Sequence, residues 1–183
     1  MRDETRGASV SASQGPKVRF ERERGVYSIS LTRDVAHMVV SIIGEGTRSE
    51  RIMQVFHTLA NAQVPIFLVK LHRTAVSFAL VAADLTRAES VMKMAGMSMR
   101  TRSDLAIVAV IAASMRAVSG VMVDISDALY AAGAHLYGTG DSHDSVLCLI
   151  EEERADAAVQ QLCLVFHLDR KVVRERNLTE AAR

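Results

Sequence analysis

The run Asp-Ser-His-Asp at positions 141–144 places two carboxylates around an imidazole and is the densest group of reactive side chains in the sequence. Such a group could perform general acid–base catalysis or bind a metal ion. The run also lies between two short apolar segments, where Asp and Ser are favoured because their side chains hydrogen-bond to the backbone of a tight turn. Three interpretations stay open: a plain turn, a turn that contacts a ligand or partner, and a catalytic cluster.

The other candidate groups do not form a recognisable catalytic or metal site. The six His residues are scattered without an HxxxH or HxH pair, and Cys148 and Cys163 lack a second Cys at metal-ligand spacing. No GxxxxGK[ST] motif or other glycine-rich phosphate loop occurs, and Gly44 to Gly46 is too short to be one. We therefore expect no catalytic residue, no metal and no cofactor, and two buried, reduced thiols.

Composition narrows the possible partners. Hydrophobic residues make up 49% of the 183 residues, but aromatic residues only 4%, which is unfavourable for a surface that stacks nucleic-acid bases. A net charge of +1, from 22 basic and 21 acidic residues, provides no strong field for attracting nucleic acid or a membrane. The start of the chain lacks the apolar core of a signal peptide, and the apolar runs are too short to span a bilayer. We expect a cytoplasmic protein that binds neither nucleic acid nor membrane.

An internal repeat organises the chain between a polar leader, residues 1–24, and a tail, residues 169–183. With an offset of 70 residues, Leu59 aligns with Leu129, Ser49 with Ser119 and Val76 with Val146, without a gap. Each repeat unit follows the order strand, helix, strand, strand, helix.

The first unit begins with a buried strand at 37–43, which ends at Gly44. Ser49 is a plausible N-cap for a helix whose apolar residues recur at helical spacing from Ile52 to Leu59. Strands are expected at 66–71 and 75–81, and a second helix, capped by Asp84, ends at Gly96.

The second unit repeats this order. A strand at 104–112 precedes a helix that opens at Ser119 and ends at Gly133, strands follow at 136–140 and 145–150, and the last helix reaches Phe166.

A split βαβ sandwich needs a fourth strand in each unit. Residues 97–102 supply one for the first unit. Nothing after Phe166 is expected to form a strand, so the alternating segment 26–31 is the candidate for the second unit. The expected fold is therefore α+β, with two ferredoxin-like βαββαβ domains and the first inserted within the second. The expected boundaries are 34–103 for the first domain, and 25–33 with 104–168 for the second.

The second unit, LAIVAVIAASMRAVSGVMVDISDALYAAGAHLYGTGDS, and the later LCLVFHL resemble the regulatory region of aspartate kinases, which consists of tandem ACT domains. The resemblance covers about residues 25–168. The sequence departs from the family at the loop positions Ala112 and Ser114, at Ser119, and at His135, where the family has Asn. In the first unit the departures are Thr47, Ser49, Glu50 and Pro65. The matching positions of the second unit are Met115, Gly120, Val121, Leu129, Gly133, Phe166 and Leu168.

The resemblance implies a non-catalytic module that binds an amino-acid effector of the lysine or threonine class, forms a homo-oligomer and assembles with an aspartate kinase catalytic chain. The kinase part is expected to be absent, because only 24 residues precede the first strand. The alternative is an ACT pair that has lost effector binding and serves only oligomerisation or interaction.

If an effector binds, we expect its carboxylate at the amides that open the second unit's first helix, where the helix dipole is positive. Asp141 would accept from the ammonium group, and His135 would influence side-chain selection. The expected ligand-binding residues are Met115, Val118, Ser119, Gly120, Val121, His135, Asp141 and Ser142. The first unit is a poorer site, because Glu50 lies at the matching helix start and would repel a carboxylate.

Overall fold

A computed structural model describes residues 25–113 and 120–176 of the chain. These residues form seven strands and four α-helices, with single-turn 3-10 helices at Ala82–Asp84, Glu152–Arg154 and Arg170–Val172. The elements in chain order are β1 (Val26–Ser41), α1 (Arg48–Asn61), β2 (Phe67–Leu71), β3 (Ala75–Val81), α2 (Leu85–Met94), β4 (Met99–Ala112), α3 (Val121–Ala131), β5 (Gly138–Asp141), β6 (Ser145–Glu151), α4 (Ala155–Val165) and β7 (Val173–Arg176).

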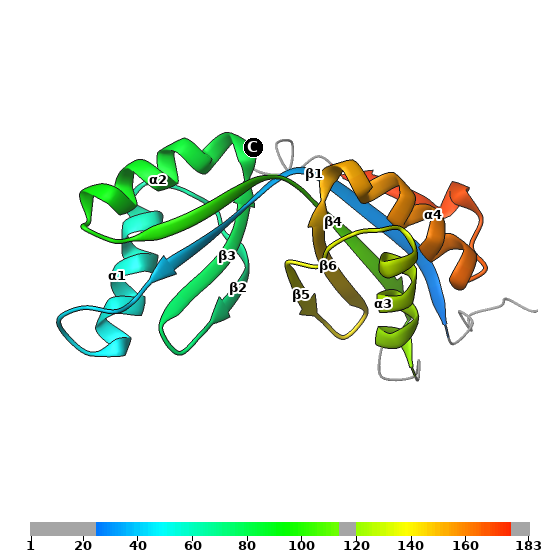
Figure 1. Cartoon of the computed structure of the whole chain (residues 1–183), viewed down its shortest axis with the longest axis horizontal. Helices are drawn as coiled ribbons and strands as arrows, with labels where there is room; N and C mark the ends of the chain where they lie inside the picture. The colour runs from blue at the N-terminus through cyan, green and yellow to red at the C-terminus, as the bar shows by residue number, and fades with distance from the viewer. Residues whose placement is uncertain (1–24, 114–119, 177–183) are drawn as a thin grey trace, which may run out of the picture.

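All seven strands belong to one sheet with the order β2-β3-β1-β4-β6-β5, and β7 pairs with β1 outside this path. Two lobes of the same build lie side by side, and the long antiparallel strands β1 and β4 run through both (Figure 1). The first lobe contains α1, β2, β3 and α2, and the second contains α3, β5, β6 and α4. The expected α+β fold class is confirmed.

Each lobe has its own apolar core between its two helices and the sheet. In the first lobe, Met38 and Phe78 of the sheet are buried with Val55, Leu59 and Met92 of the helices. In the second lobe the equivalent layer consists of Ile29, Leu31, Val108, Ile125, Leu129, Ile150 and Leu162. Burial of these side chains is the main stabilising contribution of each lobe.

The two long strands change register where they pass from one lobe to the other. Leu31 belongs to the second core and Ala36 to the first, an odd separation that would put them on opposite faces of a regular strand. The pairing is irregular between Thr32 and His37, and Asp34 has a φ of 56°. This irregularity turns the strand so that Leu31 and Ala36 both face the helices. Asp104 of β4, at φ 57°, has the same left-handed conformation. We call this region the joint.

The internal repeat is confirmed in the structure. β3 (75–81) and β6 (145–151) are 70 residues apart at both ends, as are the 3-10 helices that follow them. Asp34 and Asp104 at the joint are separated by the same offset.

Several local expectations were wrong. Thr47, not Ser49, caps α1, through a capping box in which Thr47 and Glu50 each bond the other's backbone. Asp84 precedes α2 but makes no capping hydrogen bond; its carboxylate pairs with Arg87 instead. The segment after Phe166 does contain a strand, β7, which pairs in parallel with residues 29–32 of β1. Ser28 Oγ also donates to Val172 O at 2.8 Å, which ties this segment to the second lobe.

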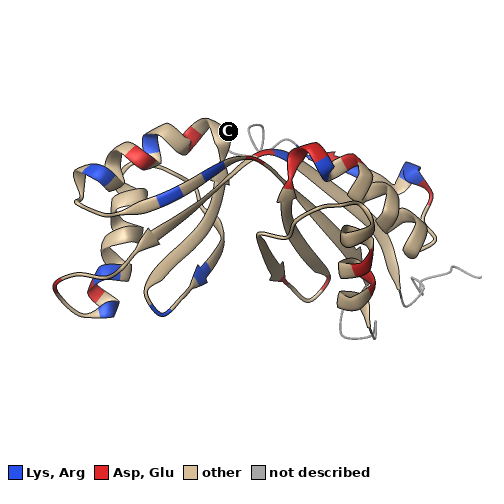
Figure 2. Ribbon diagram, viewed as in Figure 1, with Lys and Arg blue, Asp and Glu red and all other residues tan. Residues whose placement is uncertain are grey.

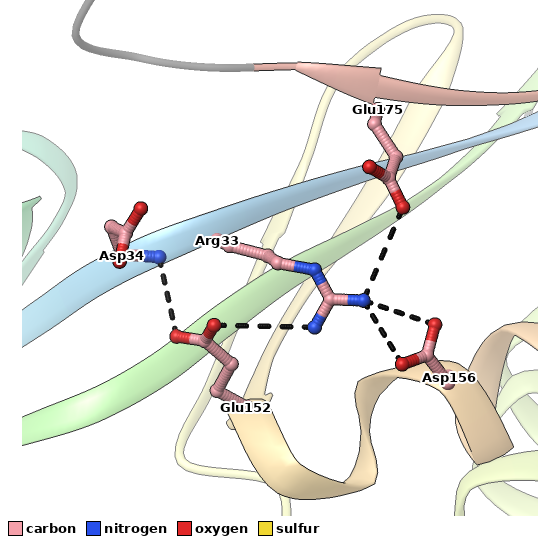
Figure 3. Close-up of polar contacts among 5 residues, drawn as sticks. All are labelled: Arg33, Asp34, Glu152, Asp156 and Glu175. Carbon is pink, nitrogen blue, oxygen red and sulfur yellow. Dashed lines mark hydrogen bonds and ion pairs between the residues drawn. The ribbon is translucent and has the colours of Figure 1, made fainter.

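An ion-pair cluster holds the joint against the second lobe (Figure 3). The Arg33 guanidinium donates to both carboxylate oxygens of Asp156 at 3.0 Å, and Glu152 and Glu175 lie 4.0 Å from it. The Asp34 amide donates to Glu152 Oε2 at 3.3 Å. One arginine thus links β1, the start of α4 and β7.

Candidate functional site

The predicted site residues fall into three groups in the structure. Met115, Val118 and Ser119 lie outside the described residues. Val121, Asp141 and Ser142 come together around a cavity of about 510 Å³ between the start of α3 and the β5–β6 turn. Gly120 directly precedes Val121 in the chain. We call this cavity the α3 pocket; its lining is Val121, Met122, Thr139, Gly140, Asp141, Ser142, His143 and Val146.

The start of α3 leaves backbone donors without a side-chain cap. Gly120 is the N-cap residue at φ 78°, and no side chain among the described residues bonds to the first turn. Its carbonyl accepts from Val123 N at 2.8 Å and Asp124 N at 3.2 Å, which closes the first turn. The first amides of a helix have no partner within the helix, and the dipole is positive there, so this end favours an anionic group.

The β5–β6 turn faces this helix start with one engaged and one unengaged acidic side chain. Ser142 Oγ donates to Asp144 Oδ1 at 2.7 Å and accepts from Ser145 N at 3.1 Å, so Ser142 organises its own turn. The Ser142 hydrogen bond lowers the pKa of Asp144 below its ordinary value. Asp141 is exposed, and its carboxylate has no hydrogen bond or ion pair with the described residues, so this group remains available for a cation.

His135 does not join the α3 pocket. It follows the far end of α3, and a helix of 11 residues is about 16 Å long. Its amide donates to Glu151 Oε2 at 2.8 Å, and its ring meets the Tyr137 ring edge-on at 4.8 Å. The structure therefore separates His135 from Gly120, Asp141 and Ser142.

The matching position in the first lobe is already filled. Glu50 Oε2 accepts from Thr47 N at 2.7 Å, and Thr47 Oγ1 accepts from Glu50 N at 3.2 Å. These backbone and side-chain hydrogen bonds lower the pKa of Glu50, so the carboxylate is charged at neutral pH. A second anion at this helix start would be repelled by the Glu50 carboxylate or would have to displace it.

Sequence reasoning missed part of the pocket. Val146 could have been found, because strand alternation from Cys148 and Ile150 places it on the helix-covered face. Met122 could also have been found, because it adjoins Val121. Thr139 and Gly140 had no sequence signal, since their role depends on how the β5–β6 hairpin lies against α3.

The described residues show buried thiols and no cluster suited to a metal ion. Cys148 is buried, and burial raises its pKa to about 11, so the thiol is protonated at neutral pH. Among residues 25–113 and 120–176, no three His, Cys, Asp or Glu side chains are placed to hold a metal ion. None of the helices in these ranges is long and apolar enough to cross a bilayer.

Comparison with known proteins gives a family model that matches part of the chain and solved structures that share the fold of most of it. A family model for the ACT domain matches residues 100–163, which lie mainly in the second lobe. No curated protein sequence matches the chain.

Three solved structures illustrate the likeness of fold. The ligand-free regulatory subunit of aspartate kinase from Thermus thermophilus has a TM-score of 0.69 at 18% identity, covering 78% of this chain and 99% of that one. A structure of aspartokinase α and β subunits has a TM-score of 0.70 at 20% identity, covering 79% of this chain and 100% of that one. Aspartokinase III from E. coli, in complex with aspartate and ADP, has a TM-score of 0.69 at 18% identity, covering 80% of this chain but 35% of that one. Residues 100–163 therefore match the model of the ACT domain, and the chain has the fold of aspartate kinase regulatory subunits.

Proposed function

We propose that this chain is a non-catalytic, amino-acid-sensing regulatory module that binds its effector in the α3 pocket. The observation that carries the proposal is the pairing of an uncapped helix start at Gly120 with the unengaged carboxylate of Asp141 across one cavity.

A free amino acid matches both ends of this arrangement. Its carboxylate accepts from the amides that open α3, where the dipole adds a favourable contribution. Its ammonium group lies toward Asp141, and its side chain is directed along Met122, Thr139 and Val146. A cavity of about 510 Å³ is ample for such a ligand.

The wider role follows from the fold shared with regulatory subunits of aspartate kinase. We propose two ACT domains, 34–103 inserted between 25–33 and 104–168, an effector of the lysine or threonine class, and a cytoplasmic role in regulating the biosynthesis of these amino acids. The partners are a second copy of the chain and an aspartate kinase catalytic chain. The structure of aspartokinase α and β subunits is a precedent for a separate chain of this fold.

A specific observation favours a second candidate, an ACT pair that only oligomerises. Ser142, predicted to contact the effector, is fully engaged by its own turn through Asp144 and Ser145. The edge strand β2 meanwhile exposes Val69 and Leu71, which suits strand pairing with another chain.

A thermal-shift screen over the twenty amino acids tests the two candidates. A ligand that binds only the folded state stabilises it by about 2.7 kcal/mol at one hundred times its Kd, which gives a clear rise in Tm. We expect at least one amino acid to raise the Tm of the chain and to lose this effect in Gly120→Asp. No shift with any amino acid at millimolar concentration would refute effector sensing and leave the oligomerisation role.

A further inference from the structure

A second cavity lies on the face of the sheet that carries no helices. It has a volume of about 510 Å³ and opens between the β2–β3 hairpin of the first lobe and β5 of the second. We call it the basic cleft. Leu68 and Lys70 form one wall, Tyr137 and Thr139 the opposite wall, and Arg100 lies at one end.

Strand register places a row of side chains across this cleft. Arg100 of β4 is paired with Val39 of β1, which is paired with Ser77 of β3, which in turn is paired with Lys70 of β2. Residues paired across a sheet project from the same face, so the two cations flank Val39 and Ser77. Lys70 Nζ lies 3.4 Å from Thr139 Oγ1, which brings it to the opposite wall.

The lining of the cleft carries positive charge and no carboxylate, and an acidic side chain contacts its wall through Tyr137 Oη, which donates to Glu151 Oε1 at 2.8 Å. The charged or titratable side chains that line it include Lys70, Arg100, His37 and His72, and no Asp or Glu is among the lining residues. Figure 2 shows the same asymmetry, since the β2–β3 hairpin carries basic but no acidic residues.

The two neighbouring arginines of β4 differ in how they are used. Arg102 donates to Tyr137 Oη at 2.8 Å and lies over the Tyr137 ring at 4.5 Å from its centroid. The Arg100 guanidinium has no hydrogen bond or ion pair within the described residues. One guanidinium thus fixes a wall of the cleft, and the other is left with its donors free.

We propose that the basic cleft binds a small organic dianion, either a phosphomonoester or a dicarboxylate. Arginine and lysine together suit such a group, because a guanidinium can bind two oxygens side by side and an ammonium adds a point charge. The hydroxyls of Ser77 and Thr139 supply further donors, and Leu68 and Tyr137 provide an apolar wall for the carbon skeleton. The linings of this cleft and of the α3 pocket share Thr139 but no other residue, and the proposal does not depend on the proposed function.

His37 makes binding dependent on pH. His72 Nε2 lies 2.8 Å from Ser77 Oγ, and burial, with a smaller contribution from His72, lowers the pKa of His37 below 6.5. The charged groups around His37 are His72 of the β2–β3 turn, Lys70 of β2, and Arg100 and Arg102 of β4, all of them basic. A bound dianion favours the protonated imidazole of His37, so affinity rises as the pH falls from 8 to 6.

Calorimetry on the full chain tests the proposal with two probes, O-phospho-L-serine and succinate, at an ionic strength of about 0.15 M. Lys70→Gln and Arg100→Gln should each weaken binding by about tenfold, the typical effect of losing one charge-assisted hydrogen bond. Lys93→Gln on α2 removes the same charge from a side chain that is 70% exposed and outside the cleft, and should leave the affinity unchanged. Gly120→Asp should also leave it unchanged, which separates this site from the α3 pocket.

Each outcome decides the matter. Binding of phosphoserine alone assigns a phosphomonoester, and binding of succinate assigns a dicarboxylate. If neither probe binds at millimolar concentration, the proposal is wrong. It is equally wrong if both cleft variants keep full affinity while their melting curves match that of the parent chain.

Discussion

Gly120 is the residue on which the α3 pocket depends most, because its left-handed backbone starts α3 and its lack of a side chain leaves the helix start open. Its φ of 78° is left-handed, and the space around its Cα holds no other atom within 4 Å of an added Cβ. We expect Gly120→Asp to abolish amino-acid binding, because a carboxylate would then sit at the amides meant for the ligand.

Gly120→Asn is the matched control for this prediction. Asn has nearly the same shape as Asp and tolerates the left-handed region, but it carries no charge. Calorimetry should show weaker binding in the Asn variant and none in the Asp variant. Equal affinity in Gly120→Asp and the parent chain would contradict the placement of the ligand.

His37 should make the fold less stable in mild acid. Its pKa in the folded state is below the ordinary 6.5, chiefly because of burial. As the pH falls below 6.5, the unfolded chain binds a proton before the folded chain does, so the free energy of unfolding decreases. Melting curves should show a smaller loss of Tm between pH 7.5 and 5.5 in His37→Gln than in the parent chain. An identical loss in both proteins would show that other groups control this pH range.

The candidate site was only partly predictable at the level of residues. Val121, Asp141 and Ser142 were found because a helix start and a strand end of one repeat unit must lie close together. His135 was included because of the family pattern, and the structure places it away from the α3 pocket, at the far end of α3. The basic cleft could not be predicted, since Lys70 and Thr139 meet only because the two lobes approach each other.

At the scale of elements, the joint in β1 and β4 allows two cores to share two strands. Asp34 adopts a left-handed conformation that only Gly, Asn and Asp tolerate well. This conformation reverses the face of the sheet to which the following side chains point. We expect Asp34→Val to lower the free energy of unfolding by about 1–2 kcal/mol, the usual cost of this conformation for a branched side chain.

Asp34→Gly separates backbone strain from the loss of the side chain. Glycine removes the carboxylate but accepts a positive φ without strain. Urea denaturation should therefore show near-parent stability for Asp34→Gly and a clear loss for Asp34→Val. Equal destabilisation in both would assign the effect to the Asp34 carboxylate.

Most elements could be predicted from periodicity, but their connections could not. The strands expected at 26–31 and 37–43 are two halves of β1, because a left-handed residue between them continues the strand instead of ending it. β7 was missed because Val-Arg-Glu-Arg is short and mostly exposed, so it lacks the apolar alternation that marks a strand. Its place depends on a partner, residues 29–32, far away in the sequence.

At the scale of the whole molecule, the edge strand β2 should mediate self-association. Val69 and Leu71 are 42% and 54% exposed, and the outer edge of β2 has no strand partner within the described sheet. We expect a dimer or larger assembly in light scattering, and Val69→Lys should shift it toward the monomer because a charged side chain opposes edge pairing. Met94→Lys, at a site that is 83% exposed on α2, is the control. A clean monomer of the parent chain at tens of micromolar would contradict this.

The chain by itself should show no aspartate kinase activity. Its sequence contains no phosphate-binding glycine loop. The side chains of residues 141–144 are exposed on the β5–β6 turn, where Ser142 and Asp144 hydrogen-bond to each other. Incubation of the purified chain with ATP should release no ADP in response to aspartate. Aspartate-dependent release that survives further purification would overturn the assignment as a non-catalytic module.

The parallel pairing of β1 with β7 has a consequence for the order in which the chain folds during synthesis. The first lobe is built from one uninterrupted stretch, so its contacts can form soon after that stretch leaves the ribosome. Residues 29–32 pair with residues 107–110 of β4 on one side, but their partner on the other side, residues 173–176, is made later, and the Ser28–Val172 bond spans 144 positions. Contacts so distant in sequence are slow to form. The second edge of this opening segment of β1 is therefore paired later than the edge that faces β4.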